Sequence, residues 1–142
     1  MKAGTWGGAP ESKKVEKLLA QLKKPQDSSF FSSNTLWDLT DEDPKGALTV
    51  LRAAEEKSRV ESLRWDPDIA KFRLYALMTL RDVDAVLATF HAYLAAARLA
   101  RGFYNPPLRQ VARFFDEMNK KAWAEEPREI EALDATYYLA RV

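Results

Sequence analysis

The stretch DAVLATFH at residues 84–91 is echoed near the end of the chain by EALDATYY at residues 131–138. Each copy begins with an acid, carries two alanines three residues apart, and has a threonine followed by an aromatic ring. Because a repeat of helix-forming residues is typical of stacked helical hairpins, this echo predicts an all-α fold. We expect antiparallel αα-hairpins in a short solenoid or a compact bundle.

Three dipeptides around the first copy mark helix starts, namely Asp43-Pro44, Asp66-Pro67 and Asn105-Pro106. In each, an Asp or Asn oxygen can accept from an exposed amide. The proline fits the first helical position, where its missing N–H would have had no partner. The dipeptides therefore predict where three helices begin.

Apolar spacing predicts about six long helices, and a shorter one near Leu36. They are expected at residues 12–24, 44–63, 67–80, 83–101 and 108–123, with a last one opened by Glu125-Glu126-Pro127. The helix at 67–80 has almost no polar face, so we expect it to be the most buried. The inward residues predicted near helix ends are Val60, Leu63, Leu133 and Tyr137.

The composition indicates one domain with one hydrophobic core, because 46% of the 142 residues are hydrophobic and 11% are aromatic. Residues 12–142 are assigned to this domain, and the glycine-rich residues 1–11 are expected to be a flexible leader. No apolar run approaches the roughly 20 residues that cross a bilayer, so no membrane span is predicted. The absence of cysteine fits an intracellular reducing compartment and excludes disulfides and thiolate catalysis.

The segment PDIAKFRLYALM at 67–78, continued by DVDAVLATF at 82–90, resembles one pentatricopeptide-type repeat. In that family Pro-Asp opens the first helix of a hairpin, and the second helix carries an alanine followed five residues later by phenylalanine. Ala85 and Phe90 match this spacing. With weaker matches on either side, the resemblance covers residues 44–142, and tetratricopeptide repeats share much of the pattern.

The resemblance implies a helical-repeat scaffold that binds a partner. Members that read RNA place a small polar residue early in the first helix, where this chain has the apolar Leu74 or Leu77. This departure favours protein binding over RNA reading. Small proteins of this type occur as accessory subunits of mitochondrial complexes, including the catalytic head of euglenozoan ATP synthases. The resemblance thus suggests such a complex and, with it, the mitochondrial matrix.

Catalytic, cofactor and metal sites are not predicted. His91 is the only histidine and aligns with Tyr138 in the echo, so an aromatic edge at a helix surface is the favoured interpretation. The close carboxylates at Asp41-Glu42-Asp43, Asp66/Asp68 and Asp82/Asp84 stand at predicted helix starts, where acids cap amides and face the positive end of the helix dipole. No glycine loop for phosphate is present.

Candidate contact residues are the aromatic and arginine side chains that helical packing does not require. They lie in the leader, in the acidic segment at 25–43, around the turn at 103–105 and on the last helix, one side of which is expected to be left for a partner. The set is Trp6, Phe30, Phe31, Trp37, Arg98, Arg101, Phe103, Tyr104, Arg109, Arg113, Tyr137 and Tyr138.

These residues support two hypotheses. The leading one is a non-enzymatic interaction subunit bound to the other protein subunits of a larger complex, since Arg and Tyr are enriched in interfaces. The alternative is a small RNA-binding helical-repeat protein, with the arginines around Phe103 and Tyr104 as a basic edge. The net charge of +1 provides no broad positive field for phosphates, which favours the first.

Overall fold

The computed structural model describes residues 10–23, 33–62, 66–99 and 106–141. These residues form helices and their connections, without a strand, so the predicted all-α class is confirmed. The seven helices are α1 (Pro10–Leu22), α2 (Ser33–Glu42), α3 (Pro44–Val60), α4 (Pro67–Thr79), α5 (Val83–Leu99), α6 (Leu108–Glu117) and α7 (Lys121–Arg141). The segment near Leu36 is a full helix, α2, which raises the predicted count of six to seven.

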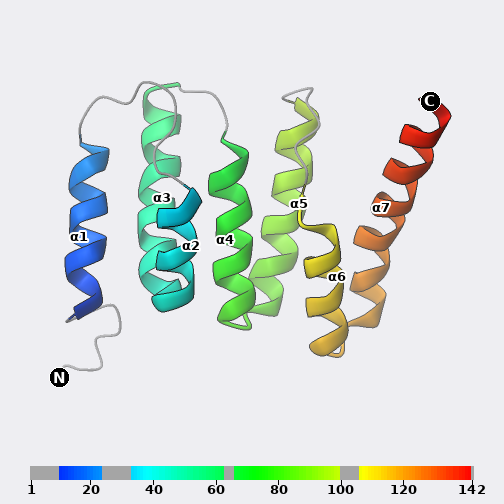
Figure 1. Ribbon diagram of the computed structural model, residues 1–142, viewed down its shortest axis with the longest axis horizontal. Coiled ribbons are helices and arrows are strands. Elements are labelled where there is room, and N and C mark those ends of the chain that lie inside the picture. Colours follow the sequence, from blue (N-terminus) through cyan, green and yellow to red (C-terminus); the bar gives the residue numbers. More distant parts are fainter. Residues whose placement is uncertain (1–9, 24–32, 63–65, 100–105, 142) are drawn as a thin grey trace.

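Consecutive helices run in alternating directions along a row, from α1 at one end to α7 at the other (Figure 1). Helix α4 contacts α3 and α5, its neighbours along the chain, and it also contacts α2. Helices α6 and α7 form a further hairpin. The two echoed segments lie on α5 and α7, each the second helix of its hairpin.

Two of the three predicted helix starts are confirmed. An Asp43 carboxylate oxygen accepts from the Gly46 amide at 3.0 Å, and Pro44 is the first residue of α3. In the same way Asp66 accepts from the Asp68 amide at 2.9 Å ahead of α4. Each acid satisfies an amide that the helix itself leaves without a partner.

The third predicted start, at Asn105-Pro106, is wrong. Helix α6 begins at Leu108, and Pro107 precedes it without a side-chain cap. The reason is the second proline of the pair. A residue before proline is sterically disfavoured in the helical conformation, so Pro106 cannot begin a helix while Pro107 follows it.

The prediction that Pro127 opens the last helix is also wrong, because α7 begins at Lys121 and contains Pro127. Asn119 takes a left-handed conformation (φ 64°), and the Lys120 amide bonds back to the Phe115 carbonyl, which ends α6 early. The first turn of α7 then buries Ala124 and sets Trp123 edge-on to Phe115, with ring centroids 5.7 Å apart. This packing outweighs the backbone bond that a proline inside a helix gives up.

The main core runs through the whole row, with side chains contributed by helices from α1 to α7. Its fully buried aromatic rings are Phe90 of α5 and Phe115 of α6. A second cluster, which includes Leu36, Leu51 and Phe72, joins α2 and α3 to α4. In α4 only Thr79 is exposed, which confirms the prediction that this helix is the most buried.

Two residues predicted to face inward are exposed instead. Val60 is 66% exposed because it lies on the side of α3 opposite to the buried positions Leu51 and Ala54. Leu133 is 67% exposed because α7, with 21 residues, extends past the 10-residue α6 on which it packs. Leu63 and the side chain of Tyr137 lie outside the described part of the chain, and α1 begins two residues inside the predicted leader.

Gly46 permits a close approach between α1 and α3. A Cβ built on it would lie 2.7 Å from Val15 Cγ2 and would overlap the Asp43 carboxylate that caps α3. Glycine is thus required here by space and not by an unusual backbone angle. We predict that Gly46→Ala lowers the free energy of unfolding by about 1–3 kcal/mol, the usual cost of overpacking, as measured by urea denaturation.

The matched control is Arg52→Ala, a change at an exposed position of the same helix, which should alter stability by less than about 0.5 kcal/mol. In an open helix position Gly→Ala stabilises by about 0.5–1 kcal/mol. An unfolding free energy that rises in the Gly46→Ala variant would therefore contradict the close approach.

Candidate functional site

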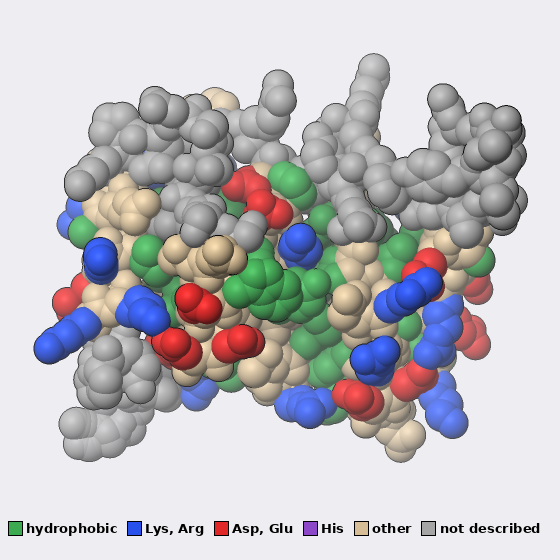
Figure 2. All heavy atoms as spheres, viewed as in Figure 1, with side chains coloured by type: hydrophobic (Ala, Val, Ile, Leu, Met, Phe, Trp, Pro, Cys, Tyr) green, Lys and Arg blue, Asp and Glu red, His purple; other side chains and the backbone are tan. Residues whose placement is uncertain are grey.

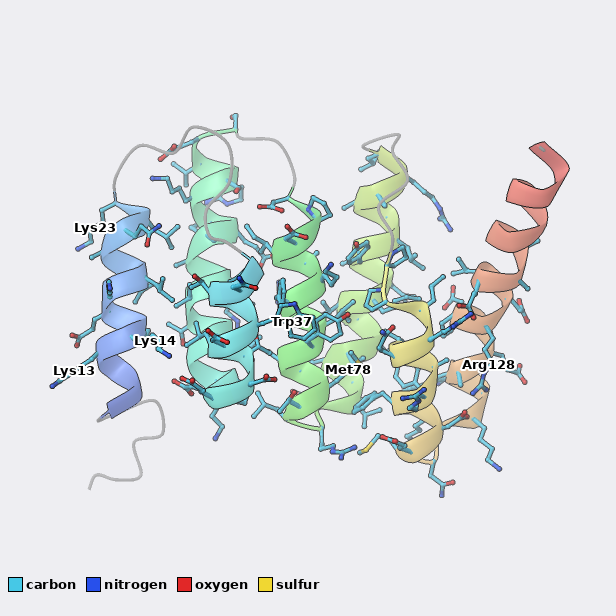
Figure 3. The ribbon with its side chains drawn as sticks, in the orientation of Figure 1. Lys13, Lys14, Lys23, Trp37, Met78 and Arg128 are labelled. Carbon is cyan, nitrogen blue, oxygen red and sulfur yellow. The ribbon has the colours of Figure 1, made fainter. Side chains whose placement is uncertain are left out.

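An open groove of about 390 Å³ crosses the face formed by α2, α4 and α6. Its apolar lining consists of Trp37 from α2, Tyr75 and Met78 from α4, and Phe114 from α6. Hydrophobic side chains gather in the middle of this face, with acidic side chains over α2 on one side and both basic and acidic side chains over α6 and α7 on the other (Figure 2). Trp37 lies between α2 and α4, and Met78 between α4 and α6 (Figure 3). We call this feature the α2/α4/α6 groove.

Trp37 is the most prominent ring in the α2/α4/α6 groove. Its neighbours Leu36 and Leu39 are buried, which fixes α2 against α3 and α4 and leaves the indole 42% exposed at the edge. The indole meets Phe72 edge-on, with centroids 5.0 Å apart, and Tyr75 at 4.9 Å. Burial raises the pKa of Tyr75 further above the neutral range, in which a phenol is protonated in any case and able to donate. Packing therefore fixes this aromatic surface in place and leaves it partly exposed to solvent.

The charged side chains of the groove are of both signs. Arg81, in the turn after α4, lies 3.6 Å from Glu117 of α6. The other two, Asp41 on α2 and Arg113 on α6, form no ion pair or hydrogen bond with any residue that the structure describes. An acid and a base that pair with no described residue therefore stand on opposite walls of the groove, with the aromatic floor between them.

Thr40 adds a buried polar group to the α2 wall. Its side chain is 2% exposed and lines the groove, and its hydroxyl has no hydrogen-bond partner among the described residues. A buried hydroxyl without a partner costs about 1–3 kcal/mol relative to a satisfied one. The oxygen is shielded from solvent, so this cost affects the stability of the fold and not binding in the groove.

Two of the predicted contact residues, Trp37 and Arg113, come together in this groove. Of the predicted basic edge, Arg109 is exposed and pairs with Glu131 of α7 at 2.6 Å. The edge as a whole stays a prediction, because three of its residues are outside the described ranges. Arg98 is exposed in the last turn of α5. The remaining predicted residues, or their side chains, lie outside the described part of the chain: Trp6, Phe30, Phe31, Arg101, Phe103, Tyr104, Tyr137 and Tyr138.

The structure also assigns contacts to the polar residues considered for chemistry. His91 lies on the surface, where its Nε2 is 2.7 Å from a carboxylate oxygen of Glu126 and links α5 to α7. Asp43, Asp66 and Asp82 each accept from an amide at a helix start, as the capping interpretation predicts. Among the described residues, no three His, Asp or Glu side chains are placed to hold a metal ion.

Several groove residues were not predicted from the sequence, among them Tyr75, Met78, Asp41 and Phe114. One signal for them exists on α6, where Gln110, Arg113, Phe114 and Glu117 follow the spacing of a single helix face. A face that mixes an aromatic ring with charges does not resemble a core stripe, and it indicates a surface that is only partly covered.

No protein-family model matches the chain, and neither a curated protein nor a solved structure was found to be similar to it. None of the helices in the described ranges is both long enough and apolar enough to cross a bilayer. The case for function therefore depends on the α2/α4/α6 groove itself.

We predict that Thr40→Val raises the free energy of unfolding by about 1 kcal/mol, because it replaces an unsatisfied buried hydroxyl by a methyl group of the same shape. Urea denaturation measures the change. The control is Thr49→Val on α3, an exposed threonine whose hydroxyl donates to the Lys45 carbonyl at 3.3 Å, with an expected change below about 0.5 kcal/mol. A loss of stability in Thr40→Val would mean that the hydroxyl is satisfied in solution.

Proposed function

We propose that this protein is a non-enzymatic interaction subunit of a larger assembly and that it binds a protein partner through the α2/α4/α6 groove. The observation that carries the proposal is Trp37, held half-exposed against Tyr75 and Phe72, with the unpaired Arg113 on the opposite wall. Trp, Tyr and Arg are the residues that most often dominate the energy of protein interfaces. A rigid aromatic surface beside a free arginine is typical of such an anchor.

The charge of the groove supports a protein partner over RNA. Its two arginines are balanced by Asp41 and Glu117, and Arg81 is already engaged with Glu117. Binding to phosphates requires cations that are free to replace counterions. One free arginine facing a free carboxylate does not form the positive track that a nucleic acid backbone needs.

The resemblance to pentatricopeptide-type repeats extends the proposal to the kind of assembly. It names mitochondrial complexes as the first to be tested, with ATP synthase among them, and the matrix as the compartment. This part of the proposal depends on the sequence pattern at residues 67–90 and on no feature of the groove.

The direct test is purification of the tagged chain from its native source, with identification of the subunits that accompany it. We expect Trp37→Ala to lose the partner, with affinity reduced about 30-fold or more, the effect of removing a residue worth about 2 kcal/mol at an interface. The control Arg52→Ala changes an exposed residue of α3 outside the groove and should retain the partner.

A filter-binding series with RNA at rising salt distinguishes the alternative. We expect the chain to show no RNA binding whose affinity falls steeply as the salt concentration rises. Steep salt-dependent binding that is lost in Arg113→Glu would overturn the protein-binding proposal in favour of RNA. A stable lone monomer with no accompanying protein would count against it as well.

A further inference from the structure

The α2/α4/α6 groove constrains the backbone of whatever fills it, and the following inference depends on the proposed protein-binding function. All three elements that line the groove are helices, whose amides and carbonyls are bonded within each helix. An extended peptide gains its affinity from main-chain bonds to a sheet edge, and the described residues offer none. A helix satisfies its own backbone and needs no main-chain partner from the groove, whereas an extended segment would have to keep its amides and carbonyls in water.

The walls constrain the charges of that helix. Asp41 stands on the α2 wall and Arg113 on the α6 wall, and neither is paired with another described residue. A helix lying along the floor would present one flank to each wall. Complementarity then requires a basic flank toward Asp41 and an acidic flank toward Arg113, whereas a helix with like charges on both flanks would face repulsion at one wall.

The floor constrains the stripe between those flanks. Trp37, Tyr75, Met78 and Phe114 call for aliphatic or aromatic anchors at helical spacing. The groove is open, so it would cover only part of a small molecule, which fits an anchored helix better than an enclosed ligand.

We propose that the occupant of the groove is a single amphipathic helix of a partner protein, with an apolar stripe bordered by Lys or Arg on one flank and by Asp or Glu on the other. A second copy of this chain could fill the groove only with a different surface, since two grooves do not fill each other, and it is a separate outcome of the test. Reversing the helix exchanges its flanks, so for a given helix only one direction places the basic flank toward Asp41 and the acidic flank toward Arg113.

The test uses three synthetic helical peptides of about 18 residues, long enough to be helical in water, that share one leucine stripe. The first has lysines on one flank and glutamates on the other, the second has lysines on both flanks, and the third has glutamates on both. Each carries a fluorescent label, and anisotropy measures its binding to the full chain. We expect the mixed peptide to bind at least about fivefold more tightly than either uniform peptide at low salt, with the difference shrinking as salt rises.

Charge reversal on each wall sharpens the test. Arg113→Glu makes both walls acidic, so it should shift the preference to the all-lysine peptide. Asp41→Lys makes both walls basic and should shift it to the all-glutamate peptide. The matched control Arg52→Glu reverses a charge outside the groove and should leave the preference for the mixed peptide unchanged.

The outcomes separate this inference from the proposed function. The helix with two charged flanks would be overturned if all three peptides bound equally well. It would also be overturned if none of them bound while Trp37→Ala still released the native partner. In both cases the proposed interaction function would remain. Sedimentation of the free chain as a dimer that Trp37→Ala dissociates would identify a second copy as the occupant and overturn the inference. If the Trp37→Ala variant retains both the peptide and the native partner, the helix inference and the proposed function are both overturned.

Discussion

The burial of α4 on both sides is the interaction on which the rest of the structure depends. A helix satisfies its own backbone but must cover its apolar surface with neighbours. Helix α4 is apolar nearly all round, and it is covered by α2, α3 and α5. Phe72 and Leu74 are both fully buried, in different clusters of the core. Because α4 needs neighbours on several sides, the other helices pack on both sides of it and the fold becomes a row of helices.

The groove is a consequence of this row. Helices α2 and α6 flank the exposed edge of α4, and the hollow between them collects side chains that the core does not use. Trp37 is held there by the burial of its neighbours on α2, and Arg113 faces it from α6 because Phe114 and Phe115 pack inward. The surface proposed for partner binding thus arises from the same packing that stabilises the fold, without a specialised loop.

Sequence signals were reliable where their physics is local. The caps at Asp43 and Asp66 require only a carboxylate and an amide two or three residues away, and both were predicted. One signal failed for a local reason, at Asn105-Pro106, where a second proline follows. Another failed because a tertiary contact competed. Pro127 has the local features of a helix start, yet the packing of Trp123 and Ala124 on α6 begins that helix earlier. In the groove, Trp37 and Arg113 were predicted to be contact residues, but not as members of one site.

The sequence by itself therefore determined the all-α class, most of the helices, their caps and the burial of α4, because periodicity and capping act within a few residues. Only the tertiary structure decided that Trp37, Tyr75 and Arg113, which come from three separate helices, line one groove with an acid and a base on opposite walls. Their meeting depends on how side chains interlock between helices that are distant along the chain. No local pattern of residues carries that information.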